Sequence, residues 1–302
     1  MIMYRHLLLL LLVLSPLFSA AQVLVVLPGV EEPGMPHFNE QFIKRNRIAA
    51  IHGELMMKPE TGPMRTKKEK YLYRFDEEGR IIYRNSSFGQ PGSGLDTAST
   101  IFHYDAQGRL TDRLRNDLNG HFGYKIDRNE KGEVVRETYS RIQNLSTDRY
   151  ALRPGTITEI SDEHFRYEYV SDSVHKKIHI NDLGLPFREQ TFSKDRHGYL
   201  RTIEDRYLVS NRLAQITFNY NENGDLAERI DRPDLSSKKS NRWVWRYDKA
   251  GNVLEGELYQ DEKQIYREEY LYDEATMMLK ARLRKDLATN TIDVIRFRTD
   301  HR

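Results

Sequence analysis

The alternation of aromatic and polar residues along the chain predicts short β-strands joined by tight turns. One pattern recurs: two aromatic residues separated by one position, then Asp or Asn, two polar residues, Gly, and an aliphatic residue two positions later. Residues two apart share one face of a strand, so each aromatic pair marks one face of a sheet. The clearest copies are YRFDEEGRI (73–81), FHYDAQGRL (102–110), FNYNENGDL (218–226) and WRYDKAGNV (245–253).

The Asp or Asn and the Gly of each copy predict a turn at that place. The Asp or Asn side chain can accept hydrogen bonds from the backbone N–H groups just ahead of it. Glycine suits the left-handed position that closes a type I turn with a bulge. Each copy is therefore expected to be the tip of a β-hairpin, and the residues assigned to these turns are Asp76, Gly79, Asp105, Gly108, Asn221, Gly224, Asp248 and Gly251.

The spacing of the copies predicts the fold class. Gly198, Gly224 and Gly251 follow one another at intervals of 26 and 27 residues, and polar breakers lie halfway between them. One period is then two strands and two turns, which gives an antiparallel meander. We expect an all-β fold: a long meander of repeated hairpins, roughly 16–20 strands, curled into a large twisted sheet, sandwich or partly closed barrel. The phase breaks once, and residues 141–163 are expected to hold the irregular stretch.

The first part of the chain has a different pattern. Residues 1–21 combine a basic start, an apolar run and small residues before Gln22, which is typical of a secretory signal peptide. The apolar run is too short to span a bilayer, although an N-terminal membrane anchor is the alternative. Residues 22–47 contain three prolines and are expected to be an extension, a loop with a short helix near 36–46. Residues 48–302 are assigned to the β-sheet domain.

Composition narrows the class of protein. The 47 Lys and Arg residues nearly balance the 45 Asp and Glu residues, which argues against a nucleic-acid partner. The absence of cysteine excludes disulfides, thiol nucleophiles and Cys-ligated metals. Only 38% of residues are hydrophobic, but 11% are aromatic, so the core is expected to rest on rings. The mature chain is expected to be exported, to the periplasm or to the extracellular side of the cell surface.

The hairpin tips resemble the YD-repeat family, also called RHS repeats, of exported bacterial proteins. The resemblance rests on the core Tyr-Asp-x-x-Gly-Arg-Leu, met by YDAQGRL (104–110), and covers roughly residues 70–298. It implies export and a repeat-built β-sheet. Large members of the family wrap such a sheet into a shell around a toxin, for which this chain has too few repeats. Ligand binding, often of carbohydrate, is a further implication that assigns no residue here.

Three rings form the candidate ligand-binding row. Trp243, Trp245 and Tyr247 alternate along one strand and so share a face. An exposed row of this kind can stack on sugar rings, and this is the ligand-binding prediction. The alternative is that the row is the apolar face of the sheet, since the other repeats place aromatic residues there too.

No metal, cofactor or catalytic site is predicted. His175 and His179 share a strand face with Lys177, but no third ligand stands at metal-binding spacing, and an exposed pair on a polar face is expected. The many carboxylates stand in turns or alternate with Arg and Lys, without the opposed pair that a glycosidase needs. The sequence also lacks nucleotide-binding and serine-hydrolase motifs.

The sequence therefore favours an exported, non-enzymatic binding protein that uses its sheet surface. The expected partner is a glycan, another cell-envelope component or an envelope protein. The first alternative is a structural or assembly protein of the cell surface with no small ligand, and the second is a glycan hydrolase. A water-soluble form is favoured over a lipid-embedded barrel, because segments such as RTIEDRYL (201–208) put charges on both strand faces.

Overall fold

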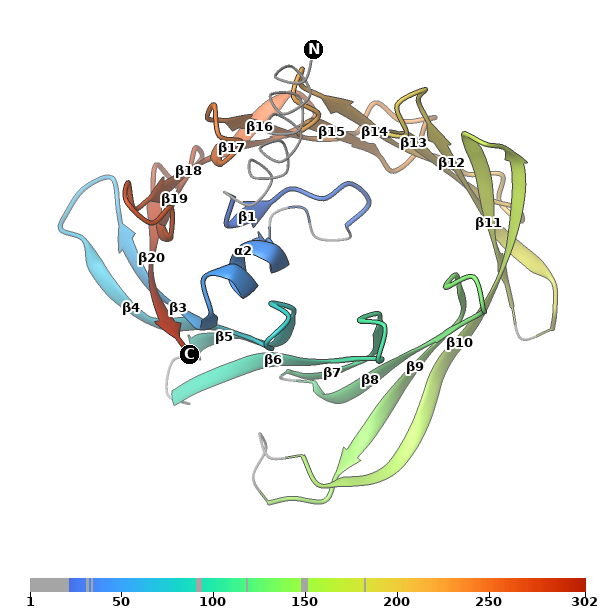
Figure 1. Cartoon of the computed structure of the whole chain (residues 1–302), viewed down its shortest axis with the longest axis horizontal. Helices are drawn as coiled ribbons and strands as arrows, with labels where there is room; N and C mark the ends of the chain where they lie inside the picture. The colour runs from blue at the N-terminus through green and yellow to red at the C-terminus, as the bar shows by residue number, and fades with distance from the viewer. Residues whose placement is uncertain are drawn as a thin grey trace, which may run out of the picture.

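The strands of this protein close into a barrel. The computed structural model describes residues 22–302 except 31, 32, 34, 91–93, 118, 148–151 and 182. Within these residues, 18 antiparallel strands form one closed ring (Figure 1). Each strand pairs with the next along the chain, and β20 (Ile292–His301) pairs with β3 (Ile48–Lys58) to close it. The all-β meander predicted from the repeats is confirmed, and its closure is complete rather than partial.

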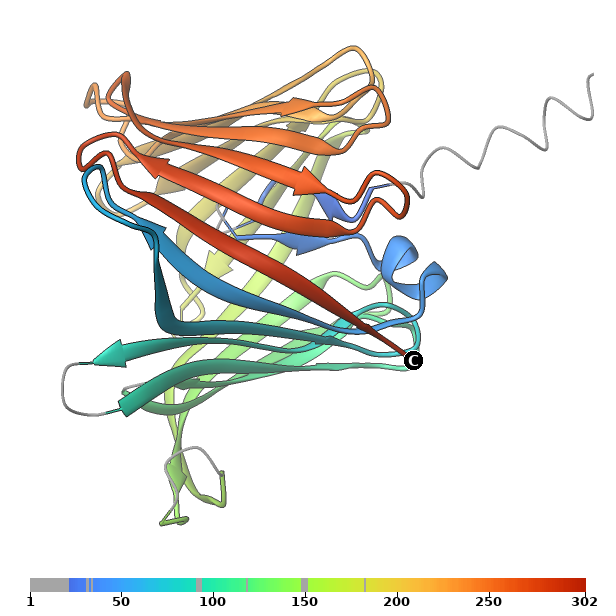
Figure 2. The same cartoon turned by 90° about the vertical axis from the view of Figure 1, so that its left-hand side faces the viewer.

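The remaining barrel strands follow in chain order. They are β4 (Arg65–Phe75), β5 (Ile81–Gln90), β6 (Gly94–Tyr104), β7 (Leu110–Asp117), β8 (Gly120–Arg128), β9 (Val134–Asn144), β10 (Pro154–Ser171), β11 (Val174–Ile180), β12 (Pro186–Lys194), β13 (Leu200–Tyr207), β14 (Leu213–Tyr220), β15 (Leu226–Arg232), β16 (Asn241–Tyr247), β17 (Val253–Gln260), β18 (Lys263–Tyr272) and β19 (Leu279–Asp286). The hairpin of β9 and β10 extends beyond the others (Figure 2). The expected irregular stretch lies here, where β10 carries two register shifts against β9.

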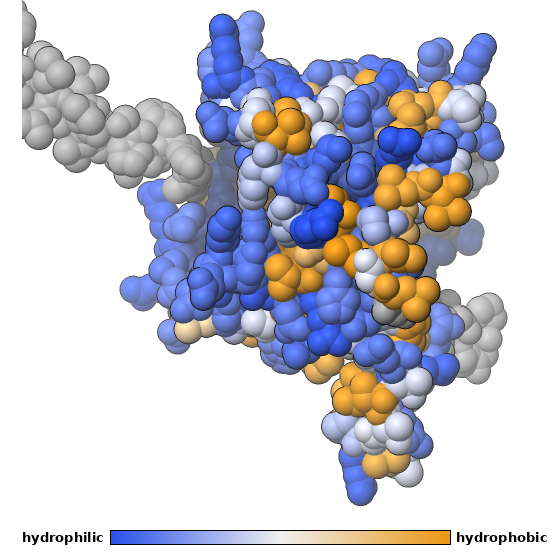
Figure 3. Space-filling view, turned by 90° about the vertical axis from the view of Figure 1, so that its right-hand side faces the viewer, coloured by the Kyte–Doolittle hydropathy of each residue, from blue (hydrophilic) through white to orange (hydrophobic). Residues whose placement is uncertain are grey.

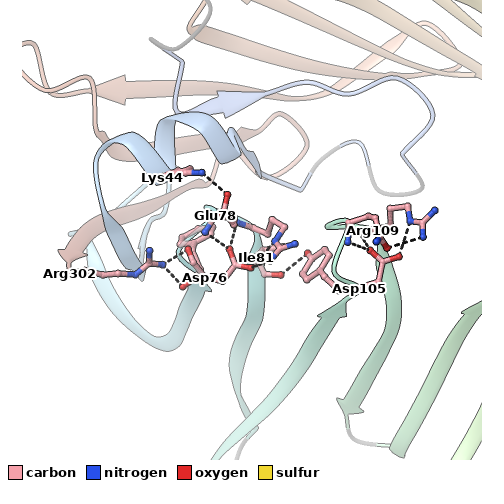
Figure 4. A network of polar contacts seen from close by, with 11 residues as sticks. Lys44, Asp76, Glu78, Ile81, Asp105, Arg109 and Arg302 are labelled. Carbon is pink, nitrogen blue, oxygen red and sulfur yellow. Dashed lines mark hydrogen bonds and ion pairs between the residues drawn. The ribbon is translucent and has the colours of Figure 1, made fainter. Parts of the chain in front are cut away.

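The Asp-x-x-Gly segments lie at the turns between strands. Asp76 Oδ1 accepts hydrogen bonds from the backbone N–H groups of Glu78 (3.0 Å) and Arg80 (2.9 Å). Gly79 has a φ of +85°, in the left-handed region that favours glycine. The same backbone bonds recur at Asp105, Asn221 and Asp248, and Gly108, Gly224 and Gly251 have φ values of +80°, +86° and +85°. Figure 4 shows the first two of these turns side by side.

The described residues of 22–47, called the N-terminal segment below, lie within the ring of strands in Figure 1, and Figure 2 shows their helix at one end of the barrel. The segment contains a two-stranded sheet of β1 (Leu24–Val25) and β2 (His37–Phe38), followed by helix α2 (Glu40–Arg45). Asn39 caps the helix, since its side-chain oxygen accepts from the backbone N–H of Gln41 at 3.0 Å. The helix falls within the stretch 36–46 where a short helix was expected. The pairing of β1 with β2 was not predicted.

The N-terminal segment supplies much of the hydrophobic core. Its buried side chains, Val23, Leu24, Phe42 and Ile43, pack in one cluster with buried residues of the barrel wall: Ile48, Ile51, Tyr73, Phe75 and Leu279. The aromatic face of the repeats is therefore the inner face of the barrel here. The N-terminal segment, which contributes no strand to the barrel, therefore supplies part of the hydrophobic core inside it.

The expected signal peptide, 1–21, lies outside the described residues. In the part of the chain that the structure describes, no helix has the length and apolar character needed to cross a bilayer.

Candidate functional site

The interior of the barrel contains a polar cavity beside the N-terminal segment. A cavity of about 490 Å³ is bounded by Gly29 and Val30 of the segment and by inward-facing side chains of the wall. Barrels with this many strands enclose more space than side chains from the wall can fill. We call this space the lumen cavity, and its polar lining includes Glu137, Lys177, His179, Arg188, Gln190 and Asp205.

A chain of hydrogen bonds fixes the polar groups on one wall of the lumen cavity. The His179 ring lies 3.1 Å from Glu163 Oε2 through Nδ1 and 3.1 Å from Gln190 Oε1 through Nε2. Gln190 Nε2 donates to Asp205 Oδ2 at 3.3 Å, and Arg188 Nε donates to Asp205 Oδ1 at 2.7 Å. These five residues come from β10, β11, β12 and β13. Because each member has a partner, the wall presents its polar groups in fixed positions.

The two histidines differ from the sequence-based expectation. His175, Lys177 and His179 share one strand face, but that face lines the lumen, and His179 is only 4% exposed. Burial lowers the pKa of both imidazoles, which favours their neutral form. The prediction of an exposed pair is wrong for His179, since closure of the sheet turned this face inward. Within the described residues, no group of three or more His, Asp or Glu residues is arranged to hold a metal ion.

The candidate row of Trp243, Trp245 and Tyr247 also faces inward. Trp245 is 7% exposed and belongs to a second buried cluster, against which Trp243, Tyr247 and Val26 of the N-terminal segment pack. Tyr247 donates its hydroxyl to the Leu226 carbonyl at 2.6 Å, and burial raises its pKa. The structure brings the row together as part of the core, which is the alternative given above. A role of the row in ligand binding stays a prediction.

Arg229 holds the N-terminal segment at the edge of the lumen cavity. Its side chain pairs with Asp231 (Nε to Oδ1, 2.7 Å), and its Nη1 donates to the Val30 carbonyl at 2.5 Å. Arg229 is 4% exposed, so this contact lies away from water. A buried, paired guanidinium that also binds the segment backbone fixes the boundary of the cavity.

A second space lies on the opposite wall. A cavity of about 270 Å³ lies between Met35 of the N-terminal segment and the inward-facing residues Arg84, Thr100 and Arg115 of β5, β6 and β7. Arg115 Nη2 lies 2.6 Å from Asp117 Oδ2, and Arg84 Nη1 donates to the Met35 sulfur at 3.1 Å. We call this space the arginine cavity.

The carboxylates of the lumen cavity act as ion-pair partners. Asp205 is held by Arg188, and Asp231 is held by Arg229. Glu137 is the third carboxylate in the lining of this cavity. Two of the three are therefore neutralised by arginine, which is not the arrangement of a general acid facing a general base.

The sequence-based reasoning missed the charged residues of the lumen. Arg188, Gln190 and Asp205 were not singled out, and Lys177 was noted only as a neighbour of the two histidines, because each stands in a strand among many other charged residues. A signal was present: Arg188 and Gln190 alternate along the strand with Phe192, the first residue of FSKDRHGYL (192–200), a looser copy of the repeat. Polar residues that share a strand face with the aromatic residues of the repeat could have been assigned to a solvent-filled interior.

Comparisons with known proteins assign neither a family nor a function to this chain. No family model matches it, and no curated protein matches it. Two similar solved structures are porin-like proteins from Bacteroides uniformis (12% identity, TM-score 0.37, covering 84% of this chain and 97% of that one) and Bacteroides vulgatus (10%, 0.33, 82% and 97%). A LolA superfamily protein from Nitrosomonas europaea has 12% identity and a TM-score of 0.19, covering 84% of this chain and 88% of its own.

Proposed function

We propose that this chain is an exported, non-enzymatic binding protein that takes a polar ligand, a glycan or another cell-envelope component, into its barrel. The observation that carries the proposal is the lumen cavity of about 490 Å³. Its size lies within the usual range of small-ligand sites, and its polar groups are held in place by one another. The expected export through residues 1–21 and the expected membership of the YD-repeat family are parts of the same proposal.

The chemistry of the lining supports a ligand rich in hydroxyl groups. Lys177 and Arg188 are donors, Asp205 is an acceptor, and Gln190 offers both kinds of group. The Phe192 ring lies in the same lining and can cover an apolar face of the ligand. A hydroxyl group both donates and accepts, so it can satisfy both kinds of partner at once. This combination replaces the exposed sheet surface on which the sequence-based proposal relied.

We propose that the barrel works in water. The residues that alternate with the inward-facing Trp245 face outward and form ion pairs across strands. Arg246 Nη1 lies 2.5 Å from Glu255 Oε2, and Arg267 Nη2 lies 2.6 Å from Oε1 of the same carboxylate. An apolar band around the outside would be needed for a lipid-embedded barrel, and charges at these positions oppose it. Figure 3 shows an outer face on which hydrophilic side chains surround a limited apolar band.

Two neighbouring lysines of β11 provide the test. Lys177 lines the lumen cavity, whereas Lys176 faces outward and pairs with Glu189 at 3.7 Å. The purified full chain is applied to a glycan array, and the affinity for the strongest glycan is measured by calorimetry. We expect Lys177→Met to weaken binding by about tenfold, as the loss of one charged hydrogen bond would. Lys176→Met removes the same charge and is expected to bind like the natural chain.

Two results would contradict the proposal. If no glycan on the array binds, the ligand class is wrong. If Lys176→Met and Lys177→Met weaken binding equally, the ligand binds outside the lumen.

An assembly role is the second candidate, and one observation favours it. The projecting β9–β10 hairpin carries exposed apolar residues near its tip, with Leu145, Ile157 and Ile160 exposed by 50%, 64% and 53%. Exposed apolar residues that gather on a projecting element are typical of a contact between protein chains. Light scattering of the purified chain, with Ile157→Glu as the comparison, tests this role. A larger mass that the substitution returns to that of a monomer would support it.

A further inference from the structure

We propose that the ligand is acidic, and that Arg84, Arg115 and Arg141 on the inner wall bind its anionic groups. This inference rests on the proposed function and names the chemical class of its ligand. It concerns the wall formed by β5 to β9, which continues into the hydrogen-bonded wall of β10 to β13 (Figure 1).

The three arginines stand in one row across the sheet. Arg84 pairs in register with Thr100, Thr100 with Arg115, Arg115 with Phe122, and Phe122 with Arg141. Paired residues of neighbouring strands share a face, and this row continues to the buried Tyr73 of the core, so it faces the lumen. Neighbouring strands lie about 4.8 Å apart, so guanidinium groups on alternate strands recur about every 10 Å.

The row contains three guanidinium groups. Asp117 pairs with Arg115 at 2.6 Å, while the contacts of the other two arginines include neutral acceptors: Arg84 donates to the Met35 sulfur, and Arg141 donates to the Asn119 carbonyl at 3.2 Å. Among the described residues that line the arginine cavity, two carry guanidinium groups and none carries a carboxylate.

The neighbouring row adds to this charge. Arg113 lies over the Tyr124 ring, 4.6 Å from its centroid, and its buried Nε has no hydrogen-bond acceptor among the described residues. On β12 and β15 the arrangement differs, because Arg188 and Arg229 there each pair with an aspartate. The guanidinium groups of β5 to β9 can therefore orient an anionic ligand on their side of the lumen.

Aromatic rings lie between the cations. Tyr124 and Tyr139 stack with their centroids 4.4 Å apart, and Phe122 stacks on Tyr139 at 5.5 Å. Guanidinium groups at regular intervals bind carboxylate or sulfate groups by paired hydrogen bonds, and ring faces cover the apolar faces of the units between them. An acidic oligosaccharide combines both features, with its charge carried by carboxylates or by sulfates.

The experiment uses matched ligands and matched arginines of one strand. Calorimetry measures binding of the full chain to oligogalacturonate and to its methyl ester, which has the same sugars without the charge. Sulfated and plain dextran oligomers form a second pair that distinguishes sulfate from carboxylate. Arg141→Gln changes the row, whereas Arg136→Gln changes the same strand on the outer face, where Arg136 pairs with Asp162 at 2.7 Å.

We expect one of the charged ligands to bind at least about tenfold more tightly than its neutral form. We also expect Arg141→Gln, but not Arg136→Gln, to remove most of that difference, with unchanged melting temperatures. Equal binding of charged and neutral forms would overturn this inference and leave the proposed function standing. Failure of every glycan, charged or neutral, would overturn both.

Discussion

At the scale of single residues, the turn glycines differ in what surrounds them. Gly79 and Gly198 both have a φ of +85°, so a side chain strains the backbone equally at either position. A Cβ on Gly198 would meet nothing within 4 Å, whereas one on Gly79 would lie 2.1 Å from the carbonyl oxygen of Glu40 in helix α2. Helix α2 of the N-terminal segment therefore packs against the turn at Gly79. Lys44 of the helix also forms an ion pair with Glu78 of the same turn (Figure 4).

We expect Gly198→Ala to lower the unfolding free energy by about 1–2 kcal/mol, because alanine is strained in a left-handed backbone conformation. Gly79→Ala should cost clearly more, because the helix must also move away from the new methyl group. Urea unfolding of the two variants measures the difference. Equal midpoints would mean that the helix does not rest on this turn.

The turn aspartates predict how stability depends on pH. The backbone N–H of Arg109, and then its guanidinium, hold the pKa of Asp105 below its usual 3.8, and Lys280 does the same for Asp273. Burial lowers the pKa of His179 below 6.5. In each case the unfolded chain takes up the proton first as the pH falls, so the folded state loses stability.

We therefore expect the urea midpoint to fall in two stages on acidification. A small fall should begin below about pH 6.5, and a larger fall should follow below about pH 4. Unfolding curves at pH 7, 5 and 3 provide the measurement. Asp105→Asn keeps the oxygen that accepts the backbone bonds but has no proton to gain, so its midpoint should change less between pH 5 and 3. A midpoint that rises on acidification would contradict the sign of these shifts.

The sequence predicted the turns well because their cause is local. An Asp76 carboxylate finds its N–H donors two and four residues ahead, so the bonds depend on no distant part of the chain. The same is not true of Trp245. Alternation shows which residues share its face, but whether that face is wet or buried depends on a segment more than 200 residues away in sequence.

At the scale of elements, the N-terminal segment is the part of the structure with the largest effect on the interior. Ile43 of α2 is completely buried among residues of the barrel wall, whereas the neighbouring Gln41 is exposed. Ile43→Ala should lower the unfolding free energy by about 2–5 kcal/mol, since it leaves a cavity in the core. Gln41→Ala should leave it within about 0.5 kcal/mol.

Thermal unfolding of both variants tests whether the segment belongs to the cooperative unit. An unchanged melting temperature for Ile43→Ala would show that the segment detaches before the barrel unfolds. The sequence predicted the short helix but not its place, because residues 22–47 have no repeat and their few apolar positions have no visible partner. Their partners are aromatic residues of β4, which sequence analysis could assign only to the sheet's own apolar face.

At the scale of the whole molecule, the contact between β3 and β20 distinguishes a barrel from an open sheet. His52 and Arg298 are directly paired across it on the outer face. The chain contains no cysteine, so a double substitution to cysteine there gives an unambiguous disulfide. Directly paired residues have Cα atoms about 4.5–5.5 Å apart, which a disulfide can bridge.

We expect His52→Cys with Arg298→Cys to oxidise completely in the folded protein and to raise its melting temperature. Thiol labelling before and after reduction, followed by mass measurement, reports the bond. His52→Cys with Arg246→Cys, which places the second thiol on β16, is the control and should keep two free thiols. Two free thiols in the first variant would mean that the ring is open.

Closure itself could not be predicted from the repeat. The repeat predicted a number of strands close to the observed number, because each Asp-x-x-Gly turn marks the end of one strand and the start of the next. Whether the last strand meets the first depends on twist and tilt summed over all of them, and no single residue encodes that sum. The sequence therefore left a curled sheet, a sandwich and a partly closed barrel as equal outcomes.

The pairing of β3 with β20 also determines when the barrel can close during synthesis of the chain. Synthesis delivers the N-terminal segment before β20, so the ring stays open until β20 has emerged. During that interval Val23, Leu24, Phe42 and Ile43 lack most of the wall that later covers them. Newly made chains therefore pass through a period with exposed apolar surface and unpaired strand edges, in which aggregation is most favoured.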